Sequence, residues 1–186
     1  MIHDADSSLP PSAWVRRFAP LIPRDGKVLD LACGNGRHSR YLAALGHGVE
    51  AVDRDSEALA ALAGERGIAT RAADLEQGPW PYAAQRFDGI VVTNYLYRPR
   101  LGDLLRTLMP GGVLIYETFM VGNEKFGKPS NPDFLLRPGE LLDVVRPTLN
   151  VVAFEQGRIE TPKPAVVQRI CAVAGDLPVL PALNSY

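Results

Sequence analysis

The sequence predicts one α/β domain built on a doubly wound sheet of seven strands, five of them parallel and the last two forming an antiparallel hairpin. Three observations predict this class. Short apolar runs alternate with helix-like segments between residues 27 and 117, which is the order of βαβ units with right-handed crossovers. A glycine-rich loop closes the first run, and such loops receive ligands at the carboxyl ends of parallel strands. Only a short, proline-rich stretch separates the last two apolar runs, which suits a hairpin.

The composition is that of an ordinary soluble protein. With 186 residues, 46% of them hydrophobic and 22% charged, the chain is expected to form a single domain over residues 1–186. A net charge of −1 gives no reason to expect nucleic acid or a membrane surface as a partner. We recognise no signal peptide and no run with the length of a membrane span. Cys33 and Cys171 lack C-x-x-C spacing, which indicates reduced thiols and a cytoplasmic protein.

The parallel strands are predicted where short apolar runs end at loops, at residues 27–31, 48–52, 68–72, 87–94 and 112–117. Helices are predicted between them at 37–47, at 55–67 and from residue 100 until Pro110 halts the chain. In the first of these helices Tyr41, Leu42 and Leu45 share one face. A last helix begins with Pro138 at its first position, and the hairpin strands 150–156 and 165–174 follow it.

Two segments lie outside this predicted sheet. Residues 1–22 form an N-terminal helical segment, in which Trp14, Phe18 and Leu21 have the spacing of an amphipathic helix. Residues 118–139 show no periodicity, and structureless loops of that length are often lids or binding loops. We therefore expect residues 118–139 to be a substrate lid. Its cations, Lys125, Lys128 and Arg137, would face an anionic or polarisable acceptor.

The glycine loop predicts a nucleoside ligand with a positive group. Gly34 and Gly36 let backbone and ligand approach closely, and Asp53, at the end of the next strand, can bind both ribose hydroxyls. A dinucleotide site requires a third glycine, but Ser39 stands at that position. Asp30, just before the loop, would repel a pyrophosphate. S-adenosylmethionine (SAM) carries an ammonium and a sulfonium and no phosphate, so it is favoured over a nicotinamide dinucleotide.

The sequence "VLDLACGNG" (28–36) resembles motif I of the class I SAM-dependent methyltransferases, although Ala32 stands where that motif usually has glycine. The resemblance spans residues 12 to 175 and includes "VDRD" (52–55), Asp74-Leu75, "FDGIVVTNYLY" (87–97) and "LMPGGVLIYE" (108–117). Up to residue 118 the chain is most similar to small bacterial methyltransferases of the tellurite-resistance type.

The resemblance implies a Rossmann-like methyltransferase fold, SAM as cofactor and S-adenosylhomocysteine (SAH) as product. It also implies a set of cofactor-binding residues, with Asp74 at the adenine amine and the region of Asn94 near the methionine part. The set comprises Asp30, Ala32, Cys33, Gly34, Asn35, Gly36, Asp53, Arg54, Asp74, Leu75, Asn94 and Tyr95.

The candidate catalytic residues are Tyr97 and Arg98, which point to the acceptor side, and Glu117, which is either a base or a lid anchor. Arg37 and His38 open the helix after the loop, either as a solvent-facing first turn or as a site for an anionic group. The histidines show no metal-ligand spacing, so no metal is expected.

The predicted function is methyl transfer from SAM to a small molecule, possible acceptors being anionic or chalcogen-containing compounds. Two alternatives stay open: an RNA or protein methyltransferase, and a SAM-binding protein without activity. The sequence leaves the identity of the acceptor, the methylated atom and the oligomeric state undetermined.

Overall fold

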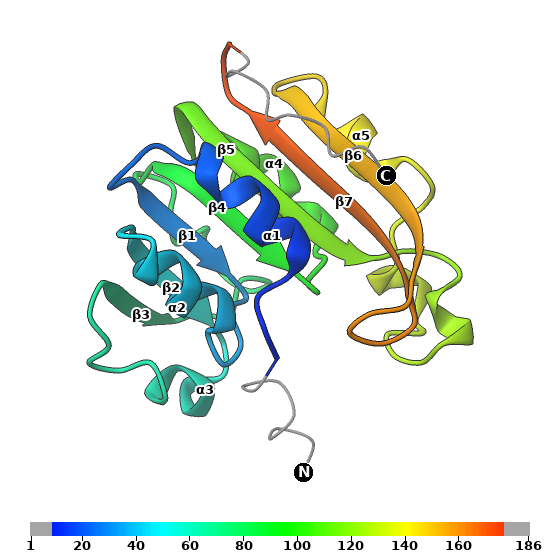
Figure 1. The fold of residues 1–186 in the computed structure, drawn as a ribbon, viewed down its shortest axis with the longest axis horizontal. Helices are drawn as coiled ribbons and strands as arrows, with labels where there is room; N and C mark the ends of the chain where they lie inside the picture. Colours follow the sequence, from blue (N-terminus) through cyan, green and yellow to red (C-terminus); the bar gives the residue numbers. More distant parts are fainter. Residues whose placement is uncertain (1–8, 177–186) are drawn as a thin grey trace.

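A computed structural model describes residues 9–176, so residues 1–8 of the predicted N-terminal helical segment lie outside the described residues. The described residues contain one seven-stranded sheet with the strand order β3-β2-β1-β4-β5-β7-β6. Strands β1 to β5 are parallel, and β7 runs antiparallel to both of its neighbours. The predicted fold class is therefore confirmed (Figure 1). The strands are β1 (Lys27–Leu31), β2 (Gly48–Asp53), β3 (Ile68–Ala72), β4 (Phe87–Thr93), β5 (Leu108–Phe119), β6 (Asn150–Ile159) and β7 (Ala165–Val173).

Helices cover both faces of the sheet, as a doubly wound fold requires. In Figure 1, α1 and α2 lie in front of the sheet and α4 and α5 behind it. Each face has its own apolar cluster: Trp14 and Leu42 belong to the first, and Leu104 and Leu141 to the second. The helices are α1 (Ala13–Phe18), α2 (Arg37–Ala44), α3 (Ser56–Ala60), α4 (Leu101–Arg106) and α5 (Glu140–Val145), with short 3-10 turns η1 (Ala19–Leu21), η2 (Arg98–Arg100), η3 (Asn123–Lys125) and η4 (Pro132–Phe134).

The alternation of side chains along β1 determines which face each residue serves. Val28 joins the cluster under α1 and α2, whereas Leu29 and Leu31 join the one under α4 and α5. Asp30 therefore faces α2, where the Ser39 hydroxyl donates a hydrogen bond to its carboxylate. The two-residue period of the strand thus places a carboxylate under the first turn of the helix that follows the glycine loop.

Four details of the predicted helices are wrong. The last helix begins at Glu140 after its cap Gly139, so Pro138 is not its first residue. The buried residues of α2 are His38, Ser39 and Leu42, whereas Leu45 is 47% exposed because the helix ends at Ala44. The second predicted helix is only the five-residue α3, capped by Asp55. The third helix ends at Arg106, and Pro110 lies in β5. The register between β5 and β4 shifts at this point, so the missing N–H of the proline removes no hydrogen bond between the two strands.

The lid segment (118–139) begins within β5 and is joined at its base. The Val121 N–H donates to the Leu136 carbonyl at 2.9 Å, and the Leu136 N–H donates to the Phe119 carbonyl at 3.0 Å. The chain between these bonds forms a loop, closed at its base, beside the β6–β7 hairpin. Within residues 9–176 no helix has both the length and the apolar character needed to cross a membrane.

Candidate active site

The carboxyl ends of the parallel strands and the lid segment enclose a main pocket of about 420 Å³. A side pocket of about 200 Å³ adjoins it, and Ala32 and Asn94 line both. The main pocket is lined by Ala32, Asp53, Arg54, Ala73, Asp74, Leu75, Glu76, Asn94, Tyr95, Leu96, Thr118, Phe119, Pro129 and Phe134. The rest of the side-pocket wall comprises Cys33, Gly34, Asn35, Arg37, His38 and Thr93. Of the residues predicted to bind a cofactor, all but Asp30 and Gly36 line one of the two pockets.

Asp53 couples the glycine loop to the end of β2. Its Oδ2 atom accepts the Gly34 N–H at 2.9 Å, and its Oδ1 atom accepts the Asp55 N–H at 3.0 Å. A carboxylate has about four lone-pair sites, so further acceptor positions of Asp53 remain for ligand hydroxyls in the main pocket. The arrangement suits the vicinal diol of a ribose.

The glycine loop is shaped by two residues with positive φ angles. Gly36 has a φ of 75°, and a Cβ atom there would lie 2.4 Å from the Leu62 side chain, so only glycine fits. Ala32 has a φ of 54°, a left-handed conformation that costs an L-residue about 1–2 kcal/mol. This conformation explains why glycine is usual at the position of Ala32.

Asp30 lies beneath the loop and is 1% exposed. The Ser39 hydroxyl donates to its Oδ2 atom at 2.6 Å. Burial raises the pKa of Asp30 to about 6, even though the Ser39 hydrogen bonds and the Arg37 charge oppose this rise. A carboxylate this deeply buried favours a ligand with a positive group above it.

His38 is a site residue whose burial the sequence did not indicate. Its Nε2 atom accepts the Ser12 backbone N–H at 3.1 Å. The ring proton of the neutral imidazole therefore lies on Nδ1, which donates to the Thr93 hydroxyl at 3.3 Å. Burial lowers the pKa of His38 to about 3, so the ring is neutral at pH 7. The solvent-facing interpretation of this residue is wrong, because its side chain is 2% exposed.

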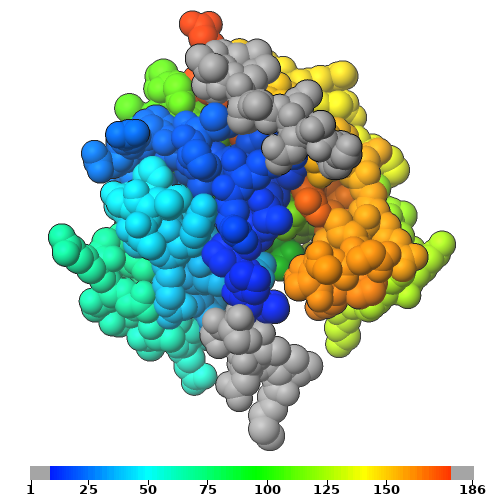
Figure 2. All heavy atoms as spheres, in the orientation of Figure 1, coloured from blue at the N-terminus to red at the C-terminus, as the bar shows by residue number. Residues whose placement is uncertain are grey.

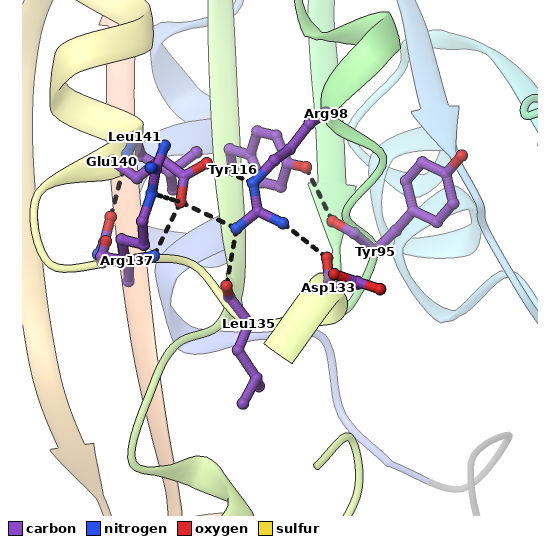
Figure 3. Close-up of polar contacts among 9 residues, drawn as sticks. Tyr95, Arg98, Tyr116, Asp133, Leu135, Arg137, Glu140 and Leu141 are labelled. Atoms are coloured by element: carbon purple, nitrogen blue, oxygen red, sulfur yellow. Dashed lines mark hydrogen bonds and ion pairs between the residues drawn. The ribbon is translucent and has the colours of Figure 1, made fainter. Parts of the chain in front are cut away.

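None of the three candidate catalytic side chains lines the main pocket or the side pocket. The Tyr97 hydroxyl donates to the Glu76 carbonyl at 3.3 Å. Arg98 forms a bidentate ion pair with Glu140 (Figure 3). Glu117 accepts the Ser12 hydroxyl at 2.8 Å and pairs with Arg169 at 3.1 Å. The catalytic roles of these residues stay predictions, and their side chains are held by other parts of the chain.

The lid segment contributes an uncharged wall to the main pocket, formed by Thr118, Phe119, Pro129 and Phe134. The predicted lid cations are absent from the residues that line the pocket. The Tyr95 hydroxyl is buried and finds no hydrogen-bond partner among the described residues 9–176, and burial raises its pKa above the ordinary value. Over residues 9–176, no group of three His, Cys, Asp or Glu side chains gathers as a metal site would require.

The strand order, the glycine loop and the acid at the end of β2 define the class: an open α/β protein with a nucleoside site at the carboxyl edge of its sheet. Residues 28–112 match the family model described as a methyltransferase domain. This match and the relatives below make the chain similar to the class I SAM-dependent methyltransferases.

A curated relative has a similar sequence. Malonyl-[acyl-carrier protein] O-methyltransferase of Pectobacterium atrosepticum is 36% identical over 128 residues, which cover 65% of this chain and 50% of the relative. The chain thus spans about half the length of the curated relative it matches.

Solved structures of methyltransferases share the fold. TehB from Haemophilus influenzae has a TM-score of 0.70 at 22% identity, covering 86% of this chain and 61% of TehB. A TehB-like SAM-dependent methyltransferase from Corynebacterium glutamicum has a TM-score of 0.63 at 22% identity, with 90% of both chains covered. The 1,6-didemethyltoxoflavin-N1-methyltransferase of Burkholderia thailandensis, solved with that compound and SAH, has a TM-score of 0.63 at 20% identity, covering 89% and 80%.

Proposed function

We propose that this chain transfers the methyl group of SAM to a small-molecule acceptor. One observation carries the proposal: a single pocket joins an acidic end, with Asp53 and Asp74, to an uncharged end closed by the lid segment. The acidic end suits a nucleoside, and the uncharged end provides a separate compartment for a second, small molecule. The lid segment is proposed to exclude water from that compartment.

The cofactor is assigned to both pockets. The ribose hydroxyls bind Asp53, and the adenine lies against Leu75 with its amine on Asp74. The methionine part enters the side pocket, between Gly34 and the His38–Thr93 pair, with Asp30 below. The assignment is supported by the polarity of the main pocket, where the carboxylates of Asp53 and Asp74 suit the ribose hydroxyls and the adenine amine. The buried carboxylate of Asp30 beneath the glycine loop suits the positive ammonium group.

The sulfonium of SAM supplies the reactive methyl group, and the protein must orient the acceptor and exclude water. None of the pocket residues from the lid segment has a titratable side chain that could act as a general base. Tyr95 also lines the pocket, but it keeps its proton because burial raises its pKa. The acceptor must therefore arrive as a nucleophile. A polarisable chalcogen acceptor, such as a thiol or selenol that ionises in water, fits this wall better than an oxyanion that requires paired cations.

Calorimetry with SAM tests the cofactor site. Asp53→Ala should weaken SAM binding roughly ten- to 150-fold, since the loss of charge-assisted hydrogen bonds costs about 1.5–3 kcal/mol. Asp88→Ala is the control: Asp88 accepts one backbone N–H, from Lys27, where Asp53 accepts two, and it lies at the opposite edge of the sheet. Equal SAM affinity in wild type and Asp53→Ala would overturn the site, as would a preference for NAD.

An acceptor screen with SAM tests the reaction. We expect SAH to form with 2-mercaptoethanol, hydrosulfide or selenide and not with simple carboxylates such as malonate. SAH formation only with transfer RNA or a protein would favour the polymer methyltransferases. A submicromolar complex with transfer RNA and a steep salt dependence would favour an RNA enzyme in particular. Tight SAM binding without SAH from any acceptor would favour the non-catalytic alternative.

A further inference from the structure

Arg98 and Glu140 form a nearly ideal ion pair next to the main pocket. Arg98 Nε donates to Glu140 Oε1 at 2.6 Å, and Arg98 Nη2 donates to Glu140 Oε2 at 3.0 Å. The Glu140 side chain is 6% exposed. Burial alone would raise the pKa of Glu140, but the hydrogen bonds from Arg98 and from the Arg137 N–H hold it below its ordinary value. The planar guanidinium matches the carboxylate in both bonds, which a lysine ammonium cannot do.

The remaining Arg98 donors reach the main chain of the lid segment. Nη1 donates to the Asp133 carbonyl at 2.7 Å, and Nη2 also donates to the Leu135 carbonyl at 2.8 Å. These two carbonyls flank Phe134, whose side chain lines the main pocket. Figure 3 shows the guanidinium between the lid segment and the start of α5. One side chain thus fixes the backbone on both sides of a pocket residue.

Glu140 also fixes the same turn through a hydrogen bond to its backbone. Its Oε2 atom accepts the Arg137 N–H at 2.8 Å. The next residue, Leu141, donates its N–H to the Gln168 side chain of β7 at 3.1 Å. The turn from residue 133 to residue 140 is therefore tied to Arg98 at one end and to the sheet at the other.

The first half of the lid segment has a separate anchor. Asn123 is 2% exposed, its Oδ1 atom accepts the Val166 N–H at 3.2 Å, and its Nδ2 atom donates to the Pro129 carbonyl at 3.1 Å. Pro129 also lines the main pocket. Pro129 and Phe134, the two residues of the pocket wall that lie between the bonds at the base of the lid segment, are thus positioned by different side chains.

Arg98 is also connected along the chain to Tyr95, a residue of the pocket wall outside the lid segment. It lies three residues after Tyr95, which lines the pocket and whose carbonyl accepts the Tyr116 hydroxyl at 2.8 Å. In Figure 3 the Tyr95 ring points away from the Arg98 guanidinium. The Arg98–Glu140 pair therefore connects the segment after β4 to the lid segment without itself lining the pocket.

We propose that Arg98 and Glu140 are positioning residues that hold Phe134 against the acceptor compartment and so limit the size of acceptor that enters. This inference rests on the proposed function for its acceptor and gives Arg98 a role different from direct catalysis. When the pair is broken, the Phe134 turn should move outward while the Asn123 anchor and the cofactor end keep their geometry.

Chymotrypsin tests the local effect, because Phe126 and Phe134 lie in the same segment with similar exposures of 39% and 46%. In Glu140→Gln, the initial rate of cleavage after Phe134 should rise at least about ten-fold, which corresponds to about 1.4 kcal/mol, and cleavage after Phe126 less than about two-fold. Arg98→Lys should give an intermediate effect. Asp143→Asn, which removes an exposed carboxylate of the same helix paired with Arg146, is the matched control. An equal rise at both phenylalanines would indicate general destabilisation and overturn the proposal.

Turnover tests the functional effect with two probes, 2-mercaptoethanol and the bulkier phenylmethanethiol. The wild type should prefer the small thiol, and Glu140→Gln should reduce this preference in kcat/KM by about ten-fold while the Kd for SAM changes less than about three-fold. An unchanged preference, or SAM affinity lost in parallel, would overturn the inference. If the wild type binds no SAM or methylates neither thiol, the proposed function fails. The Phe134 to Phe126 cleavage ratio then decides whether the pair positions the lid.

Discussion

The backbone N–H of Ser12 donates to the Nε2 atom of His38 at 3.1 Å and joins the N-terminal segment to the first turn of α2. The Ser12 hydroxyl donates to Glu117 at the end of β5 and accepts the Trp14 N–H as the cap of α1. Figure 2 shows the chain entering α1 between α2 and the β6–β7 hairpin. Because His38 lines the side pocket, Ser12 helps to fix the wall of that pocket.

Two substitutions of Ser12 separate its backbone bond from its side-chain bonds. Ser12→Ala should lower the free energy of unfolding by about 0.5–2 kcal/mol through loss of the cap. Ser12→Pro also removes the N–H and should cost a further ~1–3 kcal/mol, because the buried His38 acceptor loses its partner. The φ of Ser12 is −50°, which a proline ring tolerates. Urea denaturation measures both, and equal stabilities of the two variants would show that the Ser12–His38 bond contributes nothing.

Asp30 and His38 should affect acid stability in opposite directions. The pKa of His38 falls from 6.5 to about 3 on folding, so the unfolded chain binds a proton in this range and stability decreases as the pH falls. The pKa of Asp30 rises from 3.8 to about 6, so the folded chain binds a proton and stability increases as the pH falls. Between about pH 6 and pH 4 the two contributions cancel in part.

Single variants should therefore reveal each contribution. On going from pH 6 to pH 4, Asp30→Asn should lose about 2–3 kcal/mol of stability relative to the wild type, and His38→Asn should gain a similar amount. Asparagine keeps a polar, uncharged amide at both positions, and Arg37, whose charge acts on both groups, stays unchanged. Denaturation curves at several pH values give the slopes. Parallel slopes for all three proteins would contradict the assigned pKa shifts.

The sheet was predictable because its signals are local. Apolar runs, the glycine loop and the short connection before β7 each lie within a few residues, and parallel connectivity then brings Asp53, Asp74 and Asn94 to one edge. The interactions that sequence reasoning missed join distant positions. His38 accepts a hydrogen bond from Ser12, 26 residues away, and Arg98 is paired with Glu140, 42 residues away. No periodicity encodes which of many polar residues will meet at such separations.

Ala32→Gly should make the free protein more stable, although glycine usually destabilises. The φ of 54° costs alanine about 1–2 kcal/mol, whereas the added entropy of glycine in the unfolded chain costs about 0.5–1 kcal/mol. The expected net gain is up to ~1.5 kcal/mol in thermal or urea denaturation. Asp25→Gly is the control, because Asp25 has a φ of 57° but aspartate tolerates this region better, so its gain should be smaller. A loss of stability in Ala32→Gly would mean that the Ala32 methyl packs usefully against the pocket wall.

Glu117 is predicted to act either as a general base or as an anchor for the lid, and mutation can distinguish a base from an anchor. Its carboxylate contacts Ser12 and Arg169, and the Glu117 and Arg169 side chains are 13% and 17% exposed. The Arg169 guanidinium also lies 5.7 Å from the centre of the Trp14 ring in α1. These contacts turn Glu117 toward the N-terminal segment rather than the lid, so the structure favours an anchor for α1.

Glu117→Gln should therefore lower the free energy of unfolding by about 1–3 kcal/mol, because Arg169 loses a shielded charged partner. The pH at which turnover falls on acidification should be the same in Glu117→Gln as in the wild type, since no proton is transferred through this residue. Glu155→Gln removes the second, 43% exposed carboxylate near Arg169 and should cost less than about 1 kcal/mol. Stability is measured in urea, and turnover as SAH formation across pH 5–9. A folded Glu117→Gln protein whose turnover is lost would identify Glu117 as the base after all, and the N-terminal segment would then be part of the catalytic apparatus.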